Sequence, residues 1–255
     1  QPLPPSNLQV GPDMAAPAFQ AISALEASST GDVTVTLPAH IANDVFILHA
    51  WLRQDETILT PAGWTLITSV TRDVSPALKT YYWWWLRAAS ASETNPLIDQ
   101  SGTTSVYAQA ASFRGCRTSG NPYDVVGSPQ VGTVDPSVLT GITALTAESL
   151  IVAVMGGEDN NNAAIATTGT DPATYTEQYA ESAVGADGAI TFSYAAQGTV
   201  GATGDVSVDW DVAVPVGTGG LLMALVPPPA AGAAQFMVAA QQGRTGAGVT
   251  GRQYV

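Results

Sequence analysis

The residues of this chain that could carry out chemistry are few. Among its 255 residues there are two histidines, His40 and His49, and one cysteine, Cys116. A Ser-His-Asp triad or a histidine-bound metal would have to use one of these two imidazoles. His49 lies within the apolar run 45–52, which favours a hydrogen-bonded structural histidine. Cys116 is interpreted as a small buried or turn thiol, and a single cysteine excludes a disulfide within the chain.

Two loop motifs match known sites only in form. Gly246, Gly248 and Gly251 have the spacing of a dinucleotide fingerprint, but the last of them lies four residues from the end of the sequence. No predicted strand precedes them and no helix follows to point its N-terminus at a pyrophosphate. The run 158–162, Glu-Asp-Asn-Asn-Asn, offers oxygen ligands for Ca²⁺. It lacks the alternating ligands, glycine and final glutamate of an EF-hand loop, which favours a solvated turn.

Three aspartates alternate along one predicted strand. Asp209 and Asp211 stand two residues apart, or ~6.5 Å, with Asp205 further along. Glycosidases use carboxylates about 5 to 10 Å apart, so a glycan-degrading enzyme is one hypothesis for this row. Nothing nearby would raise the pKa of one of them, and exposed acidic rows also keep sheets soluble. We therefore predict no catalytic residue, no metal ligand and no cofactor.

The aromatic run 81–85, Tyr-Tyr-Trp-Trp-Trp, is the most informative segment. A strand there places alternate rings on opposite faces. The uncharged set is Tyr82, Trp84 and Leu86, and the other set is Tyr81, Trp83 and Trp85 with the flanking cations Lys79 and Arg87. The uncharged set is the predicted core face. The second set, with Arg87, could form a platform for sugar rings, a subunit interface or a face covered by a loop.

Composition excludes several classes of partner. The formal net charge is −13 and Lys79 is the only lysine, so no basic stripe for nucleic acid or for an anionic membrane exists. Only 11% of residues are charged, against about 25% in an average domain. The surface must therefore be built mainly from neutral polar residues. No apolar run is long enough to span a bilayer as a helix.

Alternating apolar residues predict strands through most of the chain. In the segment 205–214 the valines and Trp210 fall on one face and the aspartates on the other. Three segments, 45–52, 150–155 and 221–226, are apolar on both faces. Further strands are predicted at 32–37 and 190–194, and near 17–25, 64–70, 78–88, 104–113 and 174–184. No amphipathic helix is evident, so we predict an all-β, antiparallel two-sheet sandwich with a jelly-roll-like path.

The sequence also shows a weak internal echo. The segment 44–52 is followed by a turn and 81–86, much as 149–155 is followed by 175–179 and 190–194. Either two halves of one sandwich or a degenerate duplication would give this pattern.

Both ends differ in composition from the middle of the chain. We predict an extended arm over 1–16, a β-sandwich domain over 17–227 and an Ala- and Gly-rich tail over 228–255. The arms are too poor in apolar residues to pack alone, so they are expected to order on a partner. In the tail, Phe236, Met237 and Tyr254 are the expected docking side chains.

Several motifs together resemble a known group of proteins. They lie at 44–48, 60–67, 81–93, 110–115 and 121–124, and include Pro-Ala-Gly-Trp and Phe-Arg-Gly. This pattern resembles the β-sandwich proteins common in tailed bacteriophage genomes, which also have relatives among bacterial surface proteins. The likeness covers about residues 17–227, but the unbroken 83–85 tryptophans and the C-terminal extension depart from it. It implies an accessory structural role in a virion, without a catalytic motif.

We therefore expect a non-enzymatic, oligomeric component of a phage particle that contacts other virion proteins and copies of itself. Head decoration, tail and fibre positions all stay open. The alternative is a carbohydrate-binding or adhesin module that uses Tyr81, Trp83 and Trp85 on a host-surface glycan.

Overall fold

A computed structural model describes residues 15–72, 78–132, 136–158, 166–182, 184, 188–210 and 217–229. All regular structure in these ranges is β-strand, which confirms the all-β prediction. The same ranges hold no helix of the length and hydropathy needed to cross a membrane. Apart from residues 15 and 16, the predicted N-terminal arm lies outside the described residues. So does the tail from residue 230, including Phe236, Met237 and Tyr254.

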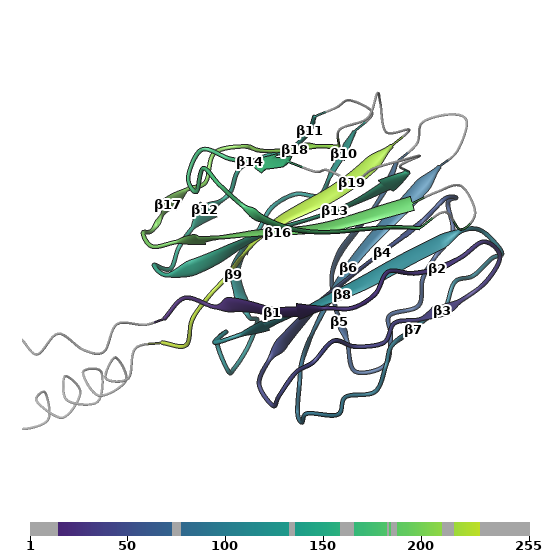
Figure 1. Cartoon of the computed structure of the whole chain (residues 1–255), viewed down its shortest axis with the longest axis horizontal. Helices are drawn as coiled ribbons and strands as arrows, with labels where there is room; N and C mark the ends of the chain where they lie inside the picture. The colour runs from purple at the N-terminus through teal and green to yellow at the C-terminus, as the bar shows by residue number, and fades with distance from the viewer. Residues whose placement is uncertain are drawn as a thin grey trace, which may run out of the picture.

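Residues 18–114 form one sheet of antiparallel strands (Figure 1). Its spatial order is β1-β8-β4-β6-β5, with β2 also beside β8. The strands are β1 (Ala18–Ile22), β2 (Glu26–Ser28), β4 (Val45–Leu52), β5 (Thr65–Arg72), β6 (Lys79–Arg87) and β8 (Val106–Arg114). A small pair outside the sheet consists of β3 (Val33–Thr34) and β7 (Leu97–Ile98). We call residues 18–114 the first repeat.

Residues 123–225 form the second sheet, and we call them the second repeat. The order here is β10-β19-β13-β16-β15, with β9 also beside β19. The strands are β9 (Tyr123–Val126), β10 (Gln130–Gly132), β13 (Ser149–Glu158), β15 (Thr176–Ser182), β16 (Gly188–Gln197) and β19 (Thr218–Leu225). Outside it lie β11 (Ser137–Leu139), β12 (Thr143–Ala144), β14 (Ala166–Thr168), β17 (Gly201–Ala202) and β18 (Val206–Asp209).

The two sheets share one strand plan and one register. Four positions that pair in a row across the first sheet have counterparts, in the same order, across the second. They are Phe19, Phe113, Val45 and Arg87 in the first repeat, and Tyr123, Leu225, Leu150 and Ala196 in the second. In the next strand, Trp85 pairs with Thr65 as Tyr194 pairs with Thr176.

Local irregularities are repeated as well. A register shift follows Phe19 in β1, and another stands at the matching place between β9 and β19. Beyond each shift, the Ser23 N–H donates to Ala110 O and the Gly127 N–H donates to Leu222 O, both at 2.8 Å. A shared bulge and a shared hydrogen bond are specific features of a fold. The echo in the sequence is therefore a structural duplication that supplies the two halves of one sandwich.

The path of the chain differs from the jelly-roll-like expectation. In a jelly roll, successive strands pass between the two sheets. Here each repeat completes its own sheet before the other begins.

Three apolar clusters explain why the central strands are apolar on both faces. The cluster between the sheets holds Ile47, Trp83 and Val152, among others, from both repeats. A second cluster covers the outer face of the first sheet with side chains of the β3, β7 and 58–64 segments. A third covers the second sheet with β11, β12 and β18. The outer clusters use matching positions, since Trp64 and Tyr175 each stand just before the matching strands β5 and β15.

At one end of the core, the first repeat has large residues at positions where the second repeat has glycine. Trp51 in β4 matches Gly156 in β13, and a Cβ on Gly156 would lie 2.5 Å from Cδ1 of Trp51. Tyr107 in β8 likewise matches Gly219 in β19, and a Cβ on Gly219 would meet the ring of Tyr81. Facing sheets leave room for one large ring at such places, so the first repeat supplies rings and the second supplies glycines.

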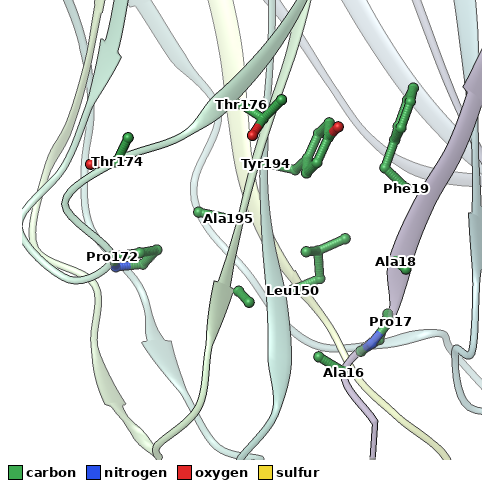
Figure 2. Close-up of a pocket in the computed structure, with 11 residues that line it drawn as sticks. Ala16, Pro17, Ala18, Phe19, Leu150, Pro172, Thr174, Thr176, Tyr194 and Ala195 are labelled. Atoms are coloured by element: carbon green, nitrogen blue, oxygen red, sulfur yellow. The ribbon is translucent and has the colours of Figure 1, made fainter.

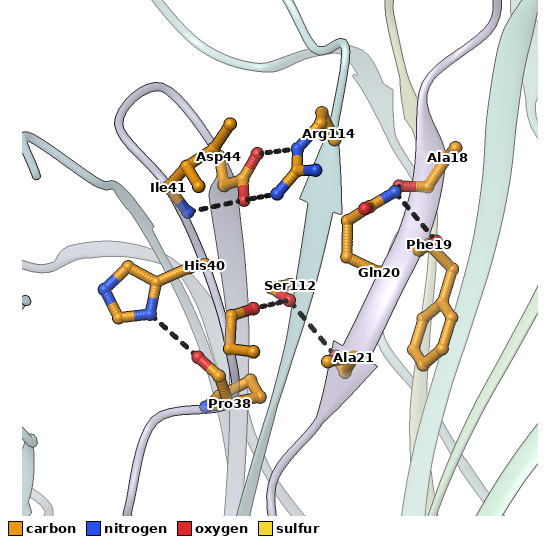
Figure 3. Close-up of polar contacts among 11 residues, drawn as sticks. Ala18, Phe19, Gln20, Ala21, Pro38, His40, Ile41, Asp44, Ser112 and Arg114 are labelled. Carbon is orange, nitrogen blue, oxygen red and sulfur yellow. Dashed lines mark hydrogen bonds and ion pairs between the residues drawn. The ribbon is translucent and has the colours of Figure 1, made fainter. Parts of the chain in front are cut away.

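An ion pair fixes the start of β4. Arg114 donates to both oxygens of Asp44, each at 2.8 Å, and the Ile41 N–H donates to the same carboxylate at 2.9 Å (Figure 3). Burial opposes ionisation of Asp44, but these hydrogen bonds and the nearby guanidinium outweigh it and hold its pKa below the ordinary value. This stabilisation is present at neutral pH and is lost as the pH falls through the lowered pKa.

Candidate functional site

A groove of about 510 Å³ runs along one side of the sandwich, where β1 faces β15 and β16 (Figure 2). We call this side the open edge. The ring of Phe19 stacks on Tyr194 with centroids 4.7 Å apart. Leu150 forms an apolar wall, and the hydroxyls of Thr174 and Thr176 lie across from the chain at Ala16. The groove is aromatic and neutral, with hydroxyl groups at its margin.

The duplication places a matching site at the opposite side, where the 117–120 segment and Tyr123 of β9 lie beside the end of β6. We call this side the closed edge. Trp85 stands there in the position of Tyr194, and Arg87 stands in the position of Ala196. The guanidinium of Arg87 lies 5.4 Å from the ring centroid of Trp85. It donates hydrogen bonds to Arg117 O at 2.6 Å and to Gly120 O at 3.1 Å.

One difference between the edges lies at the ends of β6 and β16. Arg87 and Ala196 hold equivalent positions at the ends of β6 and β16. The long side chain of Arg87 fills the space beside Trp85 and ties β6 to the 117–120 segment. Ala196 has no side chain beyond Cβ, and among the described residues the space beside Tyr194 forms the groove.

The predicted orientation of the aromatic run is wrong. Tyr81 and Trp83 point between the two sheets and are fully buried, while Tyr82 and Trp84 face the outer cluster of the first sheet. The cations do not force their face outward, because Lys79 is buried against Glu158 at 2.9 Å. Tyr81 and Trp83 thus offer no accessible ring to a glycan or a partner. Only Trp85 and Arg87 of the predicted set keep some exposed surface.

His49 is a buried structural residue, as the sequence indicates. Its Nδ1 donates to Tyr82 O at 2.9 Å, and its ring stacks on Trp83 with centroids 4.8 Å apart. Burial lowers its pKa to about 3, against the opposing effect of the bond to Tyr82. His40 lies elsewhere, bonded to Pro38 O at 2.7 Å. Cys116 is buried, and burial raises its pKa to about 12, which leaves the thiol protonated.

The acidic residues do not gather into a reaction centre in the described part of the chain. Asp205 and Asp209 are exposed while Val206, Val208 and Trp210 are buried, which confirms the alternation there. Asp205 accepts a hydrogen bond from the Gly141 N–H at 2.9 Å and so holds a turn. Asp211 lies outside the described residues.

The predicted oxygen-rich loop is described only at Glu158. This carboxylate pairs with Arg53 at 2.8 Å and with Lys79 at 2.9 Å, so it joins the two repeats. Residues 159–162 and the glycines at 246, 248 and 251 are outside the described ranges. Within those ranges, no three His, Cys, Asp or Glu side chains form a group suited to a metal.

Neither Phe19 nor Tyr194 was singled out by its sequence pattern. Both are aromatic residues on ordinary alternating strands, and only the register of two distant segments brings them together. The signal that would have found them is the repeat: aligning 190–196 with 81–87 shows an arginine replaced by Ala196.

Comparisons of the chain with protein-family models, with curated proteins and with solved structures found no match.

Proposed function

We propose that this protein is a non-enzymatic structural component of a phage particle that works by binding neighbouring proteins. The open edge carries this proposal. It is a preformed groove, lined by aromatic and aliphatic side chains, at a position where the other repeat has filled the same space with its own arginine. A groove of this kind is suited to receiving a side chain from another molecule.

The character of the potential reactive groups also favours a structural role. His49 and Asp205 each make a hydrogen bond that holds local structure, and Cys116 is a buried, protonated thiol. The apolar core between the repeats packs the strands that carry both edges against one another. A preformed, rigid surface lowers the entropy that binding costs.

The placement in a phage particle, outside the cell, rests on the resemblance of the motifs at 44–48, 60–67, 81–93, 110–115 and 121–124. The groove supports protein contact without indicating which particle. Head and tail positions are both compatible with a two-sheet module whose net charge is −13.

The test is the composition of the particle. Particles purified from the phage that encodes this chain should contain it at a fixed ratio to the major capsid or tail protein, measured by quantitative mass spectrometry. Intact particles without the chain would overturn the proposal. The purified chain alone, measured by light scattering, gives its oligomeric state independently.

A further inference from the structure

We infer that the open edge is a receptor for an arginine side chain of a neighbouring protein. The inference deepens the proposed function and rests on it for the partner, because it names the chemistry of that contact. It starts from the duplication. A guanidinium occupies this position at the closed edge, and the equivalent position at the open edge borders the groove. What fills the closed edge indicates what the open edge is built to hold.

The ligand of the closed edge is a guanidinium that comes from the chain itself. Arg87 lies over the indole of Trp85 at 5.4 Å from the ring centroid, as a cation over an aromatic face does. Its terminal nitrogen donates to Arg117 O and Gly120 O. A planar guanidinium suits this place because it stacks on a ring and donates in fixed directions at the same time.

The open edge repeats the parts that hold this group. Tyr194 stands where Trp85 stands, and Leu150 stands where Val45 stands. Ala16, three residues before Phe19, matches Gly120, three residues before Tyr123, and both stand beside their groove or guanidinium. Thr174 and Thr176 add hydroxyl oxygens at the margin. The missing part is the cation that Ala196 does not provide.

Charge supports the same occupant. The chain has a net charge of −13, so its field attracts a cationic segment and repels an acidic one. The groove itself is lined by uncharged side chains, so a guanidinium entering it meets no competing cation. Aromatic rings and neutral oxygens bind arginine through stacking and hydrogen bonds without a buried carboxylate.

The probe for the test is N-acetyl-arginine amide, titrated into the full-length chain while backbone amide signals are recorded by NMR. We expect saturable shifts at residues 174–177 and 194–196. N-acetyl-citrulline amide has the same shape without the charge, and it should bind at least about tenfold more weakly. N-acetyl-lysine amide tests whether a planar group is needed, and it should also bind more weakly.

Two variants locate the binding site. Ala196→Arg supplies the missing side chain from within, so it should abolish binding at the open edge. Ala202→Arg adds the same charge at an exposed position on β17 and should leave binding intact, which makes it the matched control. Arg87→Ala empties the closed edge, and the probe should then bind a second time with new shifts near Trp85.

Several results would overturn the inference. They are equal binding of the citrulline probe, binding that survives Ala196→Arg, and absence of binding to the wild-type chain. If binding emerges only in the Arg244→Gln, Arg252→Gln double variant, the tail of this chain is the occupant and the neighbouring protein is not. A chain that is present in particles but binds no probe keeps the structural role and loses the arginine receptor. A chain absent from particles loses the role whatever the probe does.

Discussion

The closed edge and the open edge of this sandwich occupy equivalent positions in the two repeats and differ in the side chains found there. At the closed edge, Arg87 belongs to the chain and joins β6 to the 117–120 segment through two carbonyls. At the open edge, Ala196 leaves a groove beside Tyr194. At equivalent positions, the long side chain makes an internal contact and the short one lines a groove.

The same comparison applies inside the core. The first repeat presents Trp51 and Tyr107 where the second presents Gly156 and Gly219. Two identical sheets could not bury large rings at positions that face each other. Complementary sizes at equivalent positions therefore give a close-packed interior, while different side chains at the edges give one closed and one open site.

The largest loss of stability is expected when a glycine that packs against a ring in the core is replaced by a larger residue. Gly219→Ala places a Cβ under 3.0 Å from the ring of Tyr81, so the sheets must separate or the ring must move. Overpacking of this kind costs about 1–3 kcal/mol, and we expect the upper part of that range. Urea unfolding measures the loss.

A double-mutant cycle separates this clash from a general intolerance of substitution. Tyr81→Leu removes the ring that Gly219→Ala would meet, so the double variant should be more stable than the two single losses added together predict. Simple additivity would show that the contact between Gly219 and Tyr81 does not limit the packing.

The second effect concerns the pH dependence of stability. His49 matches Val154 in the second repeat, and its pKa is lowered to about 3 by burial. The unfolded chain takes up a proton on this histidine below pH about 6.5 while the folded chain does not, so stability falls as the pH falls. The loss amounts to about 1.6 kcal/mol between pH 6.5 and pH 5, because the unfolded histidine is already half protonated at pH 6.5.

The His49→Val variant makes the two repeats alike at this position and should lose that part of the slope. Its absolute stability also changes because the cavity changes, so the comparison is between pH 6.5 and pH 5 within each variant. The wild-type chain, measured at the same two pH values, is the reference for this slope. A His49→Val chain with an unchanged slope would contradict a buried neutral imidazole.

Much of this organisation was predictable from the sequence, because alternation marks a strand wherever one face is polar. The segment 205–210 is an example, and the apolar segments 45–52 and 150–155 are strands covered on both sides as predicted. Covered strands give no sign of which face meets the other sheet, so the orientation of Tyr81 and Trp83 was wrong. Lys79 misled the assignment, because its partner Glu158 lies in the other repeat.

Local sequence patterns did not predict the groove, for a related reason. Phe19 and Tyr194 come together through the facing of two sheets, and neither neighbouring sequence contains a binding motif. Short strands such as β12 and β17 were also missed, because two residues carry no periodicity.

The third prediction concerns the loss of stability when Arg87 is removed from the closed edge. Arg87→Ala removes two hydrogen bonds to carbonyls and the stacking on Trp85, which together stabilise the fold by about 1–2 kcal/mol. Chemical denaturation in urea should show that loss. Arg87→Lys keeps the charge without the planar group and should recover less than half of it. Full recovery with lysine would mean that charge alone matters at this edge.

The smallest change in stability is expected when an arginine is placed in the groove of the open edge. Ala196→Arg places a guanidinium beside Tyr194, where it should stabilise the chain by about 0.5 kcal/mol, because the gain from stacking is partly offset by the entropy of ordering a long side chain. Ala196→Lys gives the same charge without the planar group, so the difference between the two variants in urea unfolding isolates the stacking. If arginine is no better than lysine there, Tyr194 does not repeat the role of Trp85, and the two edges share a backbone plan without sharing a preference for guanidinium.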